Sequence, residues 1–214
     1  MPSDEGEKIP IRQIGKDFTT NDWKDYHAIL PHEEYDEAYL LRMLTDDSFP
    51  EAPEGSSLPW VPLHAWRALG QMGSLSVLEP VLSLAEGDFY QQAYNDFPRL
   101  SALIGANAVE PLIAILADRS RSDTSRTLAA KGLGEIGRSS QGETRARIVE
   151  SLMNQIRQND GSDGWVNGMA AGALVTMAER SVGPEVLKMY EEGRIQGGIR
   201  PEVLFQFFGA QRTD

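Results

Sequence analysis

The stretch LAAKGLGEIG, residues 128–137, has an earlier copy in the same chain, HAWRALGQMG at residues 64–73. When the two copies are superposed, an alanine, a leucine and two glycines are identical. A third and weaker copy ends at Gly105, so the terminal glycines of the three copies are spaced 32 residues apart. A fixed spacing in this range is typical of proteins built from stacked helical hairpins. The sequence therefore predicts a repeat architecture made of helices.

Each copy predicts a first helix that ends near its terminal glycine and a second helix that follows a few residues later. Glycine favours helix ends because it adopts the left-handed conformation without a steric penalty from Cβ. We therefore expect first helices to end at Gly73, Gly105 and Gly137, with positive φ at two or more of them. The leucines at one equivalent position of the repeats are expected to be buried, and they are Leu69, Leu133 and Leu174.

The expected fold class is all-α: an α-solenoid of about four HEAT-like helical hairpins over residues 59–214, with N-terminal capping helices. Residues 1–58 are expected to form an acidic N-terminal arm and these capping helices, the second of them over residues 32–45. Residues 48–62 contain four prolines and a glycine, which favour a loop and mark the boundary. The phenylalanine-rich segment 199–208 is expected to cover the open end of the stack.

The composition disfavours several classes of function. The formal net charge is −12, and residues 1–60 alone hold 14 Asp and Glu against 5 Lys and Arg. Nucleic-acid binding is disfavoured because it requires clustered basic residues that neutralise phosphates. The absence of cysteine excludes disulfides, thiolate zinc sites and cysteine nucleophiles. We expect no membrane span, because no apolar run approaches about 18 residues, and a cytoplasmic location is the default.

The repeated blocks resemble the HEAT-like repeats of the kind first described around phycobilin lyases. The resemblance covers about residues 62–192 and is strongest at HAWRALGQMG, EPLIAIL and LAAKGLGEIG. A longer block, FPRLSALIGANAVEPLIAILAD, is also similar to part of an uncharacterised bacterial HEAT-like family. The resemblance implies the solenoid fold. It implies little about function, because repeat folds of this kind serve many unrelated roles.

Three cationic residues, Arg67, Arg99 and Lys131, are spaced 32 residues apart and occupy the same position in successive repeats. Equivalent positions line up in a stack, so this spacing predicts a row of positive charges. One hypothesis makes the row a binding stripe for an acidic peptide or a phosphate. The alternative, which we favour, is structural: each cation compensates the dipole at the end of a first helix or pairs with a neighbouring carboxylate.

A second group of candidate binding residues is aromatic or carries an imidazole. Aromatic side chains with polar groups are favoured at recognition surfaces. An equally weighted alternative is that these residues attach the N-terminal helices to the first repeat. The group consists of Trp60, His64, Trp66, Tyr90 and Tyr94.

No catalytic or metal-binding motif is recognisable in the sequence, and we expect neither a cofactor nor a metal. The only adjacent His-Glu pair is His32-Glu33, whereas an iron-binding HEAT-like hydroxylase would need several such pairs on successive repeats. Residues 119–157 hold a local excess of positive charge, with eight Lys and Arg against four Asp and Glu. A HEAT-like DNA-lesion glycosylase would combine such a patch with an aromatic-lined cleft and an acid, a set that the sequence does not assemble.

These features favour a non-enzymatic scaffold or adaptor module that binds a protein or peptide on the solenoid surface. A solenoid offers an extended curved face and no obligatory pocket, which suits this role better than catalysis. The alternative is a chaperone-like lyase or isomerase that acts on a protein-bound tetrapyrrole, and only the repeat resemblance suggests it. An enzyme is therefore the less favoured class.

Overall fold

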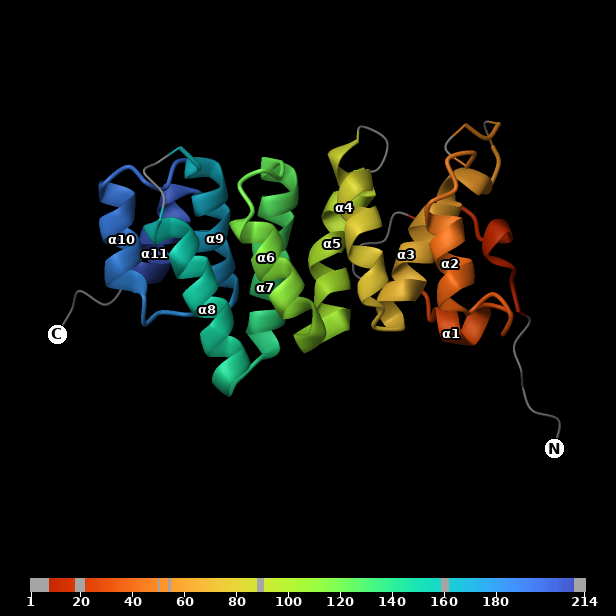
Figure 1. The fold of residues 1–214 in the computed structure, drawn as a ribbon, viewed down its shortest axis with the longest axis horizontal. Coiled ribbons are helices and arrows are strands. Elements are labelled where there is room, and N and C mark those ends of the chain that lie inside the picture. Colours follow the sequence, from red (N-terminus) through yellow and green to blue (C-terminus); the bar gives the residue numbers. More distant parts are fainter. Residues whose placement is uncertain are drawn as a thin grey trace. The chain divides into compact units, whose positions relative to one another are not determined.

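Both copies of the repeated motif are helical in the computed structural model of the chain. Residues 64–71 of the first copy belong to α3 (Val61–Gln71), and the whole second copy belongs to α7 (Asp123–Ser139). All regular elements of the described residues are helices, which confirms the all-α class. The chain divides into two compact units, residues 1–104 and residues 105–214 (Figure 1). The structure describes residues 8–17, 22–49, 51–53, 55–87, 91–158 and 162–209.

In the first unit, α3 is the central helix and packs against α2 on one side and α5 on another. Its residues from Val61 to Gly70 are all buried, because neighbours cover it on several faces. Helix α4 packs against α5. The remaining elements of this unit are η1 (Ile11–Gln13), α1 (Tyr26–Ile29), α2 (Glu37–Leu44), η2 (Leu58–Trp60), η3 (Leu75–Val77), α4 (Leu78–Glu86) and α5 (Gln91–Ile104).

The second capping helix is shorter than the sequence indicates. Helix α2 begins after Asp36 rather than near residue 32, because the Asp36 side chain accepts a hydrogen bond from the Tyr39 amide and caps the first turn. The proline-rich loop predicted over residues 48–62 also ends early. Pro62 lies in the first turn of α3, where a missing backbone N–H has no partner to lose.

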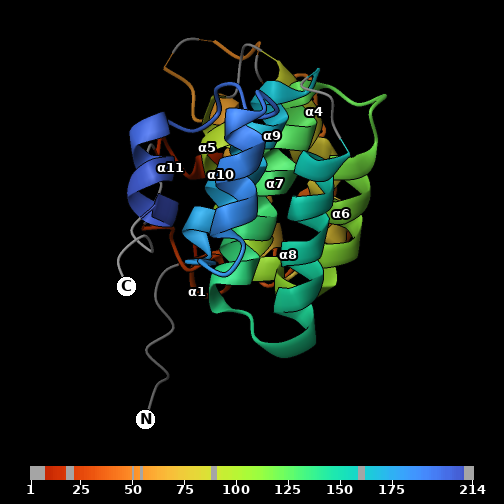
Figure 2. The ribbon, with the colours of Figure 1, turned by 90° about the vertical axis from the view of Figure 1, so that its left-hand side faces the viewer.

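In the second unit, α7 and α9 pack against each other, with α6 and α8 on one side of them and α11 on the other (Figure 2). Helix α11 packs on α9 and α10 through Leu204 and Phe208, its two buried residues. The elements of this unit besides α7 are η4 (Gly105–Ala108), α6 (Val109–Ala117), α8 (Gly142–Arg157), α9 (Gly164–Thr176), α10 (Gly183–Glu191) and α11 (Pro201–Phe208).

The leucines predicted to be buried, Leu69, Leu133 and Leu174, are each 0% exposed, which confirms the prediction of their burial. The glycine prediction is confirmed in part. Gly73 and Gly105 follow helix ends with φ values of 73° and 71°.

The prediction that Gly137 ends a first helix is wrong, because α7 continues to Ser139. Packing explains the glycine instead. A Cβ on Gly137 would lie 2.5 Å from Met177 Cε and 2.6 Å from its sulfur, so the Met177 side chain would have to move to admit a larger residue. The terminal glycine of this repeat therefore permits close packing of the chain that follows α9.

One helical stretch is longer and more apolar than the sequence analysis expected. Gln91–Ala117 has the length and composition to cross a membrane, with a mean hydropathy of 1.8 over 18 residues. It comprises α5, η4 and α6, and Gly105 interrupts its α-helical backbone with positive φ. Core helices meet the same criteria, and 44% of the window is buried here. The expectation about apolar run length is corrected, and the absence of a membrane span stays a prediction.

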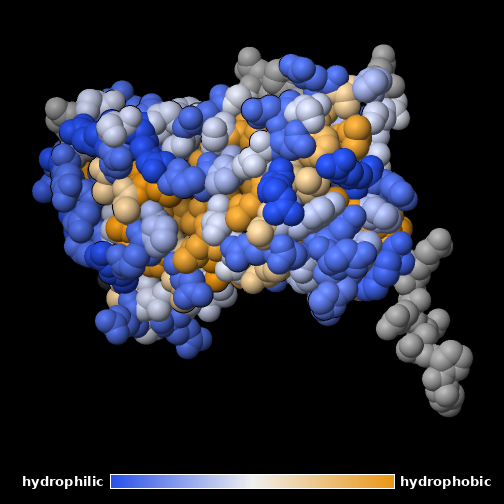
Figure 3. Space-filling view, turned by 45° about the vertical axis from the view of Figure 1, so that its right-hand side comes forward, coloured by the Kyte–Doolittle hydropathy of each residue, from blue (hydrophilic) through white to orange (hydrophobic). Residues whose placement is uncertain are grey.

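Hydrophobic residues also remain accessible on the surface. On the face shown in Figure 3, hydrophobic residues lie exposed among hydrophilic ones. Isolated exposed apolar side chains are normal in folded proteins, and only a contiguous patch indicates a contact surface. Among the described residues, the large hydrophobic side chains that are exposed are Ile9, Met72, Leu75 and Leu103 in the first unit and Trp165 and Phe205 in the second.

Candidate functional site

A buried ion pair joins α3 to α5 in the first unit. Arg67 donates to the Asp96 carboxylate from Nε at 2.6 Å and from Nη2 at 3.3 Å, and both side chains are 0% exposed. Trp66 Nε1 donates to the same carboxylate at 3.0 Å, and Gln92 Nε2 does so at 2.9 Å. Asp17 Oδ2, from the N-terminal segment, lies 3.4 Å from Arg67 Nη1. A charge in a core requires this kind of pairing.

The Trp23 ring contacts two of the three cations in the predicted row. Arg67 Cζ lies 5.0 Å from the ring centroid, and Arg99 Cζ lies 4.9 Å from it. Both distances are within the range of cation–π attraction. Trp23 is itself buried, so it joins the N-terminal segment to α3 and α5. No pattern in the sequence singled out this tryptophan.

The binding-stripe hypothesis does not fit Arg67, because burial and carboxylate pairing remove its side chain from the surface. Arg99 is half-buried in α5 and stacks on Trp23. Lys131 is half-buried in α7 of the second unit. For Arg67, the structure agrees with the structural alternative rather than with a binding role.

His64 attaches the N-terminal segment to α3. Its Nδ1 lies 2.8 Å from the Tyr26 hydroxyl and its Nε2 lies 2.9 Å from the Gly15 carbonyl oxygen. A carbonyl only accepts, so Nε2 carries the proton and Nδ1 accepts from the tyrosine. Burial lowers the pKa of His64 to about 4, and the hydrogen bond to Gly15 opposes part of this shift. His64 is therefore a neutral structural residue.

The other candidate aromatic residues divide between core and surface. Trp66 is completely buried and donates to Asp96, so it is not accessible to a partner. Trp60 is half-buried, with Lys16 Nζ 5.7 Å from its ring centroid. Tyr94 is half-buried in α5. Tyr90 lies outside the described residues. For His64, the structure favours attachment of the N-terminal segment over recognition, whereas Trp66 is a core residue bonded to α5.

The stability of the first unit should depend on pH through His64. The unfolded histidine binds a proton below pH about 6.5, whereas the folded one stays neutral down to pH about 4. Stability is therefore lost as pH falls from about 6.5 to about 4, by about 3 kcal/mol at most. Denaturant unfolding of the wild type and His64→Gln at pH 7 and pH 4 measures this loss. Equal losses in both proteins would contradict the assignment.

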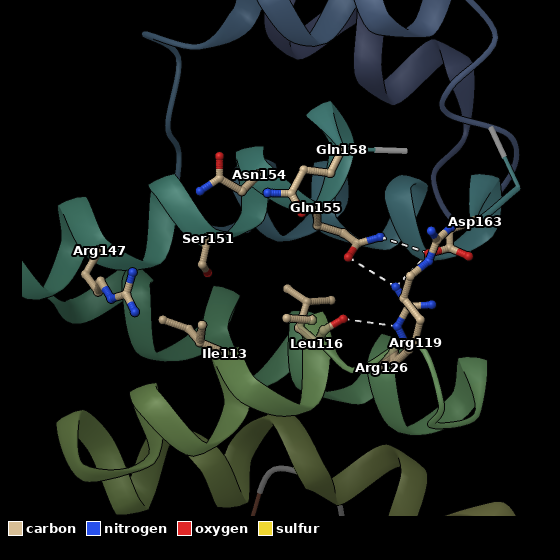
Figure 4. A pocket seen from close by; sticks show the side chains of 11 residues that line it. Ile113, Leu116, Arg119, Arg126, Arg147, Ser151, Asn154, Gln155, Gln158 and Asp163 are labelled. Carbon is tan, nitrogen blue, oxygen red and sulfur yellow. Dashed lines mark hydrogen bonds and ion pairs between the residues drawn. The ribbon is translucent and has the colours of Figure 1, made fainter. Parts of the chain in front are cut away.

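A pocket of about 230 Å³ opens in the second unit between α6 and α8 (Figure 4). Its apolar wall comes from Ile113, Leu116 and Ala117 of α6. Its polar wall is a stripe on α8 with positions four, three and four residues apart, a spacing that places side chains on one helical face. The stripe consists of Arg147, Ser151, Asn154 and Gln158, and the other lining residues are Arg119, Arg126, Gln155 and Asp163.

A hydrogen-bonded arginine closes one end of the pocket. Arg126, which is buried, donates to the Leu116 carbonyl at 3.0 Å, to Gln155 Oε1 at 3.1 Å and to Asp163 Oδ2 at 2.7 Å. These bonds tie α7 to the end of α6, to α8 and to the residue before α9. Arg126 is therefore fixed by its neighbours (Figure 4), and it contributes shape and charge to the site.

Two exposed arginines stand on the rim. The Arg119 side chain is 58% exposed, lies 3.6 Å from Asp163 and donates to Ser162 Oγ at 3.0 Å. The Arg147 side chain is 50% exposed and donates from Nε and Nη2 to Glu110, each at 2.9 Å. The hydrogen bonds from Arg147 lower the pKa of the Glu110 carboxyl. The lining thus combines three arginines with one aspartate and can receive a negatively charged group.

The sequence indicated part of this site. The excess of positive charge over residues 119–157 marks the segment that supplies all three arginines of the lining. The amide-bearing residues of α8 and Asp163 were not singled out. A helical stripe that runs from Arg147 to Gln158 could have revealed them, because its spacing is readable once α8 is assigned.

Among the residues that the structure describes, no group of three or more His, Cys, Asp or Glu side chains could hold a metal ion. Comparisons with known proteins do not assign a role to the pocket: no protein-family model matches the chain, and neither a curated protein nor a solved structure shows significant similarity to it.

Proposed function

We propose that the chain is a non-enzymatic binding module of HEAT-like helical hairpins, which holds a segment of a protein or peptide partner in the pocket between α6 and α8. The observation that carries this proposal is the pocket itself, with an apolar wall on α6 and a polar stripe on α8. Its volume of about 230 Å³ lies below the roughly 300–1,000 Å³ of pockets that enclose drug-sized ligands. A peptide side chain with its flanking backbone suits this size better than a whole cofactor does.

The solenoid arrangement belongs to the same proposal. Three features support it: the regular spacing of the sequence copies, the buried leucines at the equivalent position and the packing of α7 on α9. Helices α7 and α9 are the first helices of successive predicted hairpins, and α6 and α8 precede and follow α7 as second helices. The pocket then lies between two successive second helices, on a surface that every repeat contributes to.

Filling the pocket should abolish partner binding. Ala117 is an exposed pocket residue of α6, so Ala117→Trp places an indole in the pocket without disturbing the core. Ala114, also exposed on α6 but outside the lining, provides the matched control Ala114→Trp. Affinity purification of the full chain with quantitative mass spectrometry measures how much of a partner is recovered. We expect Ala117→Trp to lower this amount about tenfold or more and Ala114→Trp to leave it unchanged.

Reconstitution of that partner with the purified chain, followed by calorimetry, completes this test. If every retained protein binds both tryptophan variants equally, the pocket is not the binding site and the proposal is wrong. The tetrapyrrole alternative stays a prediction. It would require the purified chain to carry visible absorbance that Ala117→Trp or another surface change removes.

A further inference from the structure

Two side-chain amides in the pocket have no hydrogen-bond partner among the residues that the structure describes. Asn154 of α8 is half-buried and Gln158, which caps the end of α8, is exposed; both line the pocket, and neither side chain makes a hydrogen bond or ion pair with another described residue. In Figure 4 they carry no dashed line, whereas the adjacent Gln155 is tied to Arg126 and Asp163. A carboxamide offers two donors and one acceptor with two lone pairs, the same groups that a peptide backbone requires.

The spacing of these amides fits an extended chain. Residues four apart on a helix have Cβ atoms about 5–6 Å apart, close to the spacing of about 6.6 Å between alternate residues of a strand. From Arg147 to Gln158 the stripe rises about 16 Å along α8, the length of about five extended residues. Asn154 and Gln158 can therefore pair with alternate peptide groups of one segment.

The arginines on the rim favour a segment that carries carboxylates. Arg147 commits two of its five N–H groups to Glu110, which leaves three for a ligand. Arg119 stands at the opposite end of the pocket and is similarly exposed. The ion pair of Arg147 with Glu110 is exposed on both sides, so a ligand carboxylate can compete for it at little cost.

We infer that this pocket recognises an extended acidic peptide segment of about five residues. The inference rests on the proposed function, which makes the pocket a binding site. Carboxylates near the two ends of the segment pair with Arg147 and Arg119. Its backbone hydrogen-bonds to Asn154 and Gln158, and one apolar side chain between the carboxylates packs on Ile113 and Leu116. Charge complementarity and the free amides together define this occupant.

Selection from a random twelve-residue peptide display library tests the inference on the full chain, with Ala117→Trp as the counter-selection target. The expected result is enrichment of peptides that carry Asp or Glu on both sides of a Leu, Met or Phe. Pocket-dependent peptides without acidic residues would overturn the inference and leave the proposed function standing. If no peptide depends on the pocket, the inference is overturned, and the partner test with the Ala117→Trp and Ala114→Trp variants decides the proposed function separately.

Affinities of the enriched peptide, measured by fluorescence anisotropy, then assign the individual contacts. Arg147→Glu should weaken binding about tenfold or more, and Asn154→Ala about fivefold. Arg138 is also exposed and pairs with Glu135 outside the pocket, so Arg138→Glu is the charge-matched control and should leave binding unchanged. Equal weakening by both reversals would show an unspecific charge effect and would contradict the inference.

Discussion

Gly168→Ala should destabilise the second unit by about 3 kcal/mol or more, because the new methyl group has no space. Gly168 lies in α9, where a Cβ would be 1.7 Å from the Gly197 carbonyl oxygen and 3.1 Å from Gly198 Cα. Both contacts are to backbone, so no side-chain rotation relieves them. The Asn167 side chain, which donates to the Arg194 carbonyl at 2.7 Å, holds the same segment against α9.

The matched control lies one turn further along the same helix. Nothing approaches within 4 Å of a Cβ added at Gly172, so Gly172→Ala should stabilise by up to about 1 kcal/mol through helix propensity. Urea unfolding of both variants and the wild type measures the two effects. Opposite signs are expected. If Gly168→Ala is as stable as Gly172→Ala, the segment after α10 does not pack on α9 as described.

The helical class and the burial of the equivalent leucines could be predicted from sequence, because both depend on local patterns. The spacing of HAWRALGQMG and LAAKGLGEIG places Leu69 and Leu133 in the core, as observed. The role of Gly137 could not be predicted, since a glycine that ends a helix and one that admits Met177 look identical in sequence. The difference depends on a contact with a residue 40 positions later.

The same reason explains the errors at the candidate site. The 32-residue spacing of Arg67 and Arg99 suggested equivalent surface roles, but the environments of both side chains depend on Trp23 from the N-terminal segment. The repeat pattern predicts only the contacts between repeats. It does not predict where a segment outside the repeats packs. The pocket was missed because its two walls come from α6 and α8, and assigning two helices does not show which of their side chains face each other.

Asp96→Ala should destabilise the first unit by about 3–5 kcal/mol, since it leaves the buried Arg67 guanidinium with its main partner removed. The remaining carboxylate near this cation is Asp17, at 3.4 Å from Nη1. The hydrogen bond from the Trp66 indole N–H to Asp96 would also be lost inside the core. Denaturant unfolding of purified Asp96→Ala and wild type measures the difference in the free energy of unfolding.

Two further variants show that the effect arises from an uncompensated charge rather than from lost packing. The double variant Arg67→Met with Asp96→Leu removes both charges of this pair and should be more stable than Asp96→Ala, because apolar residues of similar volume can replace a buried ion pair, while Asp17 keeps Lys24 at 3.6 Å. Glu110→Ala breaks the exposed pair with Arg147 and should leave the melting temperature nearly unchanged. If Asp96→Ala behaves like Glu110→Ala, Arg67 is solvated, and the binding-stripe hypothesis for this residue becomes tenable again.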